Sequence, residues 1–228
     1  MAPTSTTPSL APSDLSALQK RLPLIGLTGG IGSGKTAVST LLSDLGAGIV
    51  DADLIAHQLT APNGKAIPFI AKEFGPDFIA PHGGLDRAKM RALVFEDPPS
   101  RIRLEQITHP LIRDEAIRQA LELAEKGVPY IVFVVPLLVE SAAWKKLVVH
   151  IIVVDCPEEA QIERVMQRSN LSRTQVQGIL GAQAGRQERL SCADTIIEND
   201  GHFELLEKKV QDLHQKILNI AQHHTSSS

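Results

Sequence analysis

The sequence predicts an α/β fold with a parallel sheet, and three observations carry this prediction. Short apolar runs alternate with stretches of helical periodicity, and continuously apolar runs are typical of strands covered on both faces. A glycine-rich segment directly follows the first run, at a strand-to-helix junction. Residues 55–126 break the rhythm with helical patterns and turn signals, so we expect a helical insertion that carries a second substrate.

Five apolar runs are expected to form the strands of the sheet. They are residues 24–28, 48–51, 130–135, 148–154 and 195–198. Beyond them, apolar residues recur every three to four positions, at Leu206, Val210, Leu213, Ile217 and Ile220. This spacing predicts an amphipathic closing helix. A partner could cover its apolar face, but the more ordinary expectation is that this face covers the chain's own core.

Both ends of the chain are expected to be disordered. Residues 1–22 begin with a segment rich in Ser, Thr and Pro, which is too polar and too interrupted by proline to pack a core. The polar residues 223–228 are expected to form a disordered tail. The leader is poor in acidic residues, as organelle transit peptides are, but its first sixteen residues contain no Arg, which transit peptides favour.

Composition excludes several classes of protein. The chain has 228 residues, 43% of them hydrophobic and 21% charged, which is ordinary globular usage. The net charge of -3 provides no general field that would attract nucleic acid or an anionic membrane, so an anionic ligand must be met locally. Cys156 and Cys192 match no metal-ligand spacing and cannot form a disulfide framework, which favours a reducing cytoplasm.

Residues 29–36 read GGIGSGKT and match the pattern G-x-x-x-x-G-K-[ST] of a phosphate-binding loop. Its glycines let backbone N–H groups converge on phosphate oxygens, and the helix expected from Lys35 adds its N-terminal dipole. We expect Lys35 to lie against the β- and γ-phosphates and the Thr36 hydroxyl to bind Mg²⁺. The motif predicts binding of ATP or GTP. The sequence lacks the D-x-x-G and N-K-x-D patterns of a GTP switch, so guanine-specific signalling is disfavoured.

Two acidic residues follow the second predicted strand. Asp51 and Asp53 stand two apart in GIVDAD and would face one way in extended chain next to the phosphate loop. One carboxylate could lie near Mg²⁺ and the other could accept a proton from an attacking hydroxyl, and we assign Asp53 as that base. For an isolated D-x-D, a solvated turn or a helix N-cap would be the more ordinary explanation.

Arginines are clustered late in the chain. Arg164 and Arg168 stand four apart on a predicted helix, and Arg186 and Arg189 stand three apart in GRQERL. Phosphoryl transfer requires cations over the γ-phosphate, and these often arrive on a mobile lid, here expected over residues 158–189. Taken singly, each of these arginines is more often a solvated or ion-paired surface residue, and only their clustering favours a function.

Five segments resemble the dephospho-coenzyme A kinase family in their order and spacing. They read LTGGIGSGKT, VDADLIAHQL, HPLIR, VPLLVE and QAGRQERLSCADTIIENDG, and the similarity spans about residues 24–201. LTGGIGSGK followed by DAD is specific, because adenylate and guanylate kinases differ around their loops. The resemblance implies transfer of phosphate from ATP to the ribose 3'-hydroxyl of dephospho-CoA, the last step of coenzyme A synthesis.

The resemblance also implies roles for individual residues. Asp53 would be the base at the ribose hydroxyl, Arg164 and Arg168 would belong to the lid, and Arg186 would lie near the ATP phosphates or base. ATP would be held by Thr28, Gly29, Gly30, Ile31, Gly32, Ser33, Gly34, Lys35 and Thr36. The acceptor, dephospho-CoA, would meet His109, Arg113, Leu137, Leu138 and Glu140.

The resemblance implies a P-loop kinase, with a five-stranded parallel sheet flanked by helices, a helical coenzyme A domain and a lid. The expected domain covers residues 23–222, and its core is formed by 23–54, 127–157 and 190–222. Thr36 replaces a Ser that is frequent in the family, with an equivalent hydroxyl, and Gly178 stands where relatives often carry Arg. We expect a monomer or weak homo-oligomer that uses Mg²⁺, ATP and dephospho-CoA and binds neither nucleic acid nor membrane.

Two other functions remain open on the sequence alone. A kinase of the same architecture could act on a nucleoside or a nucleoside monophosphate. A nucleotide-dependent regulatory protein could bind ATP without transferring phosphate.

Overall fold

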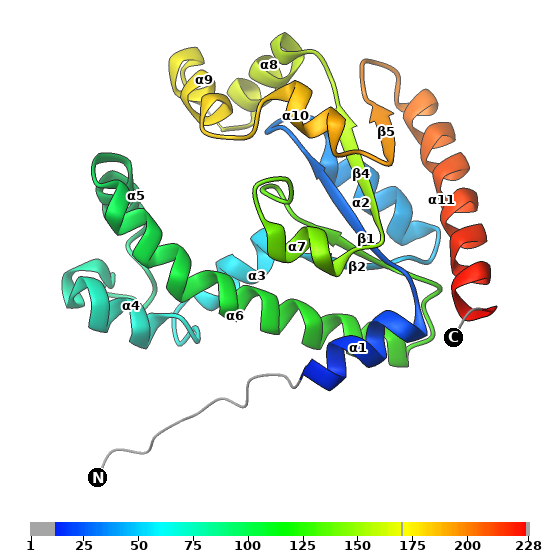
Figure 1. Ribbon diagram of the computed structural model, residues 1–228. Helices are drawn as coiled ribbons and strands as arrows, with labels where there is room; N and C mark the ends of the chain where they lie inside the picture. The colour runs from blue at the N-terminus through cyan, green and yellow to red at the C-terminus, as the bar shows by residue number, and fades with distance from the viewer. Residues whose placement is uncertain (1–11, 170, 227–228) are drawn as a thin grey trace. The chain divides into compact units, whose positions relative to one another are not determined.

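The protein contains a five-stranded sheet, seen in a computed structural model that describes residues 12–169 and 171–226 (Figure 1). The strands are β1 (Leu24–Gly29), β2 (Gly48–Asp51), β3 (Ile131–Val134), β4 (His150–Asp155) and β5 (Thr195–Glu198). Their order in the sheet is β2-β3-β1-β4-β5, and β1 pairs in parallel with both β3 and β4. The predicted α/β fold with a parallel sheet is confirmed.

The apolar runs form strands because both of their faces are covered. Every residue of β1 and of β3 is buried, as the continuous apolarity of these runs predicted. β5 lies at the edge of the sheet, and only its third residue, Ile197, is buried. The phosphate loop therefore follows a central strand, which is held on both sides.

One core lies between a face of the sheet and two helices, α2 (Lys35–Asp44) and α11 (Phe203–Ser226), which lie side by side in Figure 1. Alternate residues of β1, β3 and β4 point into this core, as the two-residue period of a strand requires. From α11 the core receives Leu206, Val210, Leu213 and Ile217. The closing helix thus covers the chain's own core, and its predicted amphipathic face is confirmed.

Among the described residues, the sheet-bearing unit contains five further helices of 6 to 12 residues. They are α1 (Pro12–Arg21), α7 (Ala142–Leu147), α8 (Glu158–Ser169), α9 (Arg173–Gly181) and α10 (Arg186–Ser191). The last three occupy the span where the lid was expected. No helix in the described part of the chain is long and apolar enough to cross a membrane.

The expected disorder of residues 1–22 is wrong for residues 12–22. Helix α1 is anchored because Leu18 is 1% exposed, Gln19 Nε2 donates to Leu147 O at 3.2 Å, and Arg21 Nη2 donates to Ala124 O at 2.7 Å. The disorder was predicted from the polar composition of the leader as a whole, but this segment contains two apolar residues that are buried, Leu18 and Leu22. At the other end α11 continues to Ser226, so residues 223–226 are helical and not a disordered tail. The rest of both predicted tails lies outside the described residues.

Residues 51–118 form a second compact unit, whereas the sequence predicted an insertion over 55–126. It contains α3 (Ala52–Leu59), α4 (Ile67–Phe74), η1 (Pro76–Phe78), α5 (Arg87–Glu96) and most of α6 (Pro98–Glu125). An isolated bridge pairs Ile79 with Leu85. The sheet-bearing unit comprises residues 12–50 and the chain from 119 onward.

Candidate active site

The phosphate loop is shaped by glycines that no other residue could replace without strain. Gly32 and Gly34 have φ angles of 75° and 102°, in the region that L side chains rarely adopt. A Cβ atom at Gly34 would also lie 2.0 Å from Asn199 Nδ2. Helix α2 begins at Lys35, as predicted, and has neither a side-chain cap nor an acidic residue in its first turn. The loop therefore presents helix N–H groups to which an anion can bind.

Lys35 folds over the loop that precedes it. Its Nζ donates to Gly29 O at 2.9 Å and to Gly30 O at 3.1 Å. Thr36, in the first turn of α2, is exposed, whereas Ser33 is buried and its Oγ has no hydrogen-bond partner among the described residues. Lys35, predicted to bind the phosphates, and the Thr36 hydroxyl, predicted to bind Mg²⁺, therefore both lie at the surface of the loop.

Asn199 and Arg164 hold the loop from outside. Asn199 Nδ2 donates to Ser33 O at 2.8 Å, and Arg164 donates to Gly32 O at 3.5 Å and to Asn199 O at 3.1 Å. The structure therefore brings Arg164 to the phosphate loop. Arg168, four residues further along α8, is exposed and makes no such contact among the described residues. Sequence reasoning missed Asn199, whose only signal is a position just after the last strand.

Arg186 and Arg189 have different environments although both lie on α10. The Arg186 guanidinium is paired with Asp155 at the end of β4, and hydrogen bonding to this carboxylate raises the pKa of Arg186. Arg189 is only 6% exposed, and its Nη1 donates to Ala184 O. The helix thus presents one ion-paired surface arginine and one buried arginine.

The other predicted site residues of the sheet-bearing unit differ in whether a ligand can reach them. Thr28 is fully buried, and its hydroxyl donates to Pro136 O at 3.1 Å. Leu138 is also fully buried, close to Gly26, so the structure does not place it in the lining of a cleft as the resemblance implied. Leu137 is 43% exposed, and the Glu140 carboxylate accepts the Ala184 N–H at 2.7 Å. Leu137 and Glu140 remain accessible to a ligand.

Asp51 ends β2 in extended chain, as the sequence argument assumed, but Asp53 does not. Asp51 is the N-cap of α3, and its Oδ1 accepts the N–H groups of Asp53 and Leu54 at 2.8 and 3.1 Å. Asp53 is therefore an exposed residue in the first turn of a helix. The strand that ends at Asp51 is also not the neighbour of β1, since β3 lies between them.

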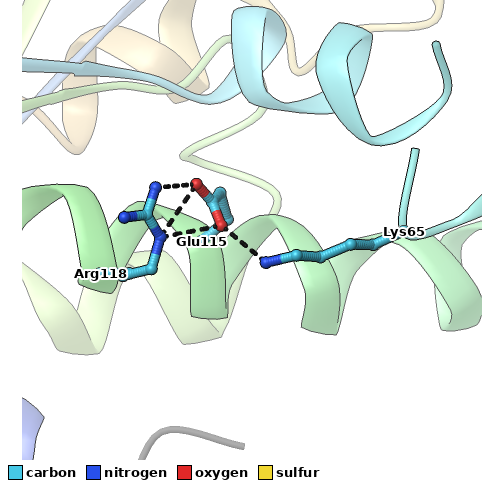
Figure 2. A network of polar contacts seen from close by, with 3 residues as sticks. All are labelled: Lys65, Glu115 and Arg118. Carbon is cyan, nitrogen blue, oxygen red and sulfur yellow. Dashed lines mark hydrogen bonds and ion pairs between the residues drawn. The ribbon is translucent and has the colours of Figure 1, made fainter. Parts of the chain in front are cut away.

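Helix α6 carries His109 and Arg113, both exposed, four residues apart on one face. Figure 2 shows how the next turn is fixed: Glu115 accepts from Lys65 at 3.2 Å and from Arg118. The Glu115 side chain is 13% exposed, so this carboxylate is largely withdrawn from water between two cations. The network anchors α6 to the segment that precedes α4.

The helical unit also contains a hollow of about 410 Å³. Its wall includes His57, His82 and Arg87 beside the apolar Pro62 and Leu85. Arg87 Nη2 donates to Thr60 Oγ1 at 2.7 Å, which fixes the guanidinium at the rim. The hollow combines groups that can contact phosphate or amide oxygens with an apolar wall.

Residues 23–204 match the model of the dephospho-CoA kinase family. A dephospho-CoA kinase of Burkholderia thailandensis is 56% identical over 198 residues, which cover 86% of this chain and 96% of that protein. The dephospho-CoA kinase of Cupriavidus pinatubonensis is 52% identical over 190 residues, which cover 83% of this chain and 91% of that protein.

Two solved structures are similar to this one along most of the chain. The protein TT1252 from Thermus thermophilus gives a TM-score of 0.73 at 32% identity, covering 86% of this chain and 97% of that chain. The dephospho-CoA kinase from Campylobacter jejuni gives a TM-score of 0.59 at 25% identity, covering 86% and 98%.

Proposed function

Because this chain belongs to the dephospho-CoA kinase family, we propose that it transfers the γ-phosphoryl group of ATP to the ribose 3'-hydroxyl of dephospho-CoA. The products are coenzyme A and ADP, in the last step of coenzyme A biosynthesis. The observation that carries the proposal is the phosphate loop, whose strained glycines lead into the uncapped, acid-free N-terminus of α2.

ATP is held by residues 28–36. The loop amides surround its phosphates, and Lys35 exchanges its bonds to Gly29 O and Gly30 O for phosphate oxygens. Arg164 and Arg168 screen the charge of the transferring group from the lid, and Arg186 borders the nucleotide. Thr28 contributes indirectly, because its buried side chain holds the end of β1 in place below the loop.

Asp53 is the general base. An exposed carboxylate in the first turn of α3 can reach an acceptor, and it takes the proton of the ribose hydroxyl as that oxygen attacks the γ-phosphorus in line. The bond from the γ-phosphorus to the bridging oxygen breaks, and ADP leaves with that bond's electron pair.

A kinase that uses ATP implies a divalent metal ion, and we propose Mg²⁺. The described residues include no group of three or more His, Cys, Asp or Glu that could hold a metal by themselves, so the ion would arrive with the nucleotide. The exposed Thr36 hydroxyl fits as one ligand, and Asp51 retains a second carboxylate oxygen beside its capping role. Bound Mg²⁺ neutralises charge on the β- and γ-phosphates.

Dephospho-CoA is received by His109 and Arg113 on α6, with Leu137 and Glu140 as further contacts. The hollow beside Arg87 is suited to part of this long acceptor, since it offers both hydrogen-bond donors and apolar surface. Both cysteines are free thiols, which supports a cytoplasmic enzyme, and we expect a monomer or weak homo-oligomer.

The test is ADP release in a coupled assay with ATP and Mg²⁺, with dephospho-CoA or AMP as acceptor. Stimulation by dephospho-CoA alone is the expected result. Stimulation by AMP alone would make the protein a nucleoside monophosphate kinase, and ATP binding without stimulation by either acceptor would indicate a regulatory protein.

A further inference from the structure

Arg189 is a buried cation without a carboxylate partner among residues 12–169 and 171–226. It is 6% exposed, its Nη1 donates to Ala184 O, and the nearby Asp155 is already paired with Arg186. Burying a guanidinium without a counter-charge is unfavourable, so this environment favours an anionic ligand.

The free side of the Arg189 guanidinium lies over the phosphate loop. A Cβ atom at Gly30 would lie 3.1 Å from Arg189 Nη2 and 2.2 Å from Gln161 Oε1. Gly30 has no positive φ that would require glycine, so the space taken by these two side chains explains why a glycine stands there. Arg189 Nη2 and Gln161 Oε1 therefore both lie beside Gly30, the second residue of the loop.

Gln161 presents an unused acceptor at this point. The residue is 2% exposed, its Nε2 donates to Cys156 O at 3.0 Å, and its Oε1 has no hydrogen-bond partner in the described part of the chain. Because the Cys156 carbonyl accepts only from the amide nitrogen, the orientation of the side-chain amide is fixed with its oxygen toward Gly30. A carbonyl oxygen repels a phosphate oxygen but accepts from a guanidinium.

We propose that Arg189 contacts a phosphate oxygen of the nucleotide in the loop and that Gln161 positions it by accepting from Nη2. This inference rests on the proposed function, because it assumes that the loop binds ATP. Arg189 is then a catalytic residue, whereas Gln161 acts only through Arg189.

The first experiment compares steady-state kinetics of the full-length protein with those of Arg189→Met and Gln161→Leu, at saturating dephospho-CoA. Arg189→Met is expected to lower kcat/KM for ATP by about 100-fold, the usual effect of removing one donor to developing charge. Gln161→Leu is expected to lower it by about tenfold, as for other residues that orient a functional group. Gln167→Leu, on the exposed side of α8, is the matched control and should match the wild type.

Gln161→Glu separates positioning from packing. Glutamate loses the bond to Cys156 O, but it keeps an oxygen acceptor and adds a negative charge that attracts the guanidinium, so it should restore part of the activity that leucine loses. In an Arg189→Met background, Gln161→Leu should add no further loss, because the two residues act as one unit. If Gln161 only fills space, leucine would be tolerated better than a buried glutamate, and that order of activities would overturn the positioning role.

Thermal unfolding of each variant shows whether it folds. If Arg189→Met does not fold, Arg189→Lys replaces it: lysine keeps the charge but loses the planar fork, so kcat/KM should still fall. If the wild type shows no ADP release stimulated by dephospho-CoA, the proposed function is wrong. If the wild type is active and the folded Arg189 variant keeps its kcat/KM, only the inference about Arg189 and Gln161 is wrong.

Discussion

Arg186 and Asp155 form a two-pronged ion pair in which Nε lies 3.0 Å from Oδ1 and Nη2 lies 2.6 Å from Oδ2. Asp155 is the last residue of β4 and is 7% exposed, and its backbone oxygen accepts the Asn199 N–H at 2.8 Å. This aspartate thus connects the end of β4, the start of α10 and the turn after β5.

Asp155→Asn should lower the midpoint of thermal unfolding by a few degrees. The amide keeps the shape of the carboxylate but loses its charge, so the guanidinium loses its charge-assisted bonds. Calorimetry or circular dichroism measures the shift. Glu159→Gln is the matched control, because Glu159 and Arg173 make a similar pair on the surface, where water screens it, and little change is expected. Equal shifts in the two variants would contradict a special role for Asp155.

Asp53→Asn should leave the Kd for ATP unchanged and lower kcat by about 100-fold or more, because the amide cannot accept the ribose proton. Equilibrium binding of a fluorescent ATP analogue and the coupled assay measure the two quantities. Asp212→Asn, on the exposed face of α11, is the control. Lys35→Ala should instead weaken ATP binding itself. Full turnover by Asp53→Asn would remove Asp53 from the role of base.

Gly30→Ala should raise KM for ATP, because the new methyl group would enter the space of Gln161 Oε1 and Arg189 Nη2. Gly178→Ala is the counterpart, since no atom lies within 4 Å of a Cβ at that position in α9. Alanine favours helix there by roughly 0.5–1 kcal/mol, so the free energy of unfolding should rise. Michaelis constants and urea unfolding test both variants, and unchanged kinetics for Gly30→Ala would show that the contact is loose.

The free energy of unfolding should decrease as the pH falls below about 6.5. Burial lowers the pKa of His214, whose Nδ1 lies 2.7 Å from the Tyr130 hydroxyl, so the unfolded chain takes up its proton before the folded one. Burial also lowers the pKa of His150, which acts in the same direction. The stabilisation that comes from keeping these histidines neutral is therefore fully present above the histidine pKa of the unfolded chain. It is lost as the pH falls below that pKa.

Urea unfolding between pH 8 and 5.5 measures this slope. His214→Gln keeps a partner for the Tyr130 hydroxyl and removes one titrating group, so its slope should be shallower than that of the wild type. His202→Gln changes an exposed residue and should leave the slope as it is. A wild-type slope in His214→Gln would mean that His150 accounts for the whole effect.

The features that could be predicted from the sequence are those encoded locally. The run that became β1 and the glycines after it specify their own conformation, so the strand, the loop and the start of α2 at Lys35 were all predicted. Asp53 was misplaced because Asp51 caps a helix with its side chain, and a D-x-D pattern is equally compatible with a cap and with extended chain.

The environments of Arg186 and Arg189 depend on distant residues. The partner of Arg186 lies 31 positions away in the sequence, and Arg189 is buried beside Gly30 and Gln161, which come from two other parts of the chain. The three-residue spacing between the two arginines does not predict which of them is buried. Asn199 was missed for the same reason, since its contact with Ser33 spans 166 positions.

The insertion of residues 51–118 between β2 and β3 sets the order in which the chain can acquire structure. Leu24 pairs with Ile131 and Ile25 with His150, so β1 cannot pair with β3 or β4 until the whole helical unit has been synthesised. Closing so long a loop from an unfolded chain is entropically costly, and early folding of the helical unit shortens the span that must be closed. On the ribosome, nucleotide binding is thus a late event, although the phosphate loop emerges before the helical unit.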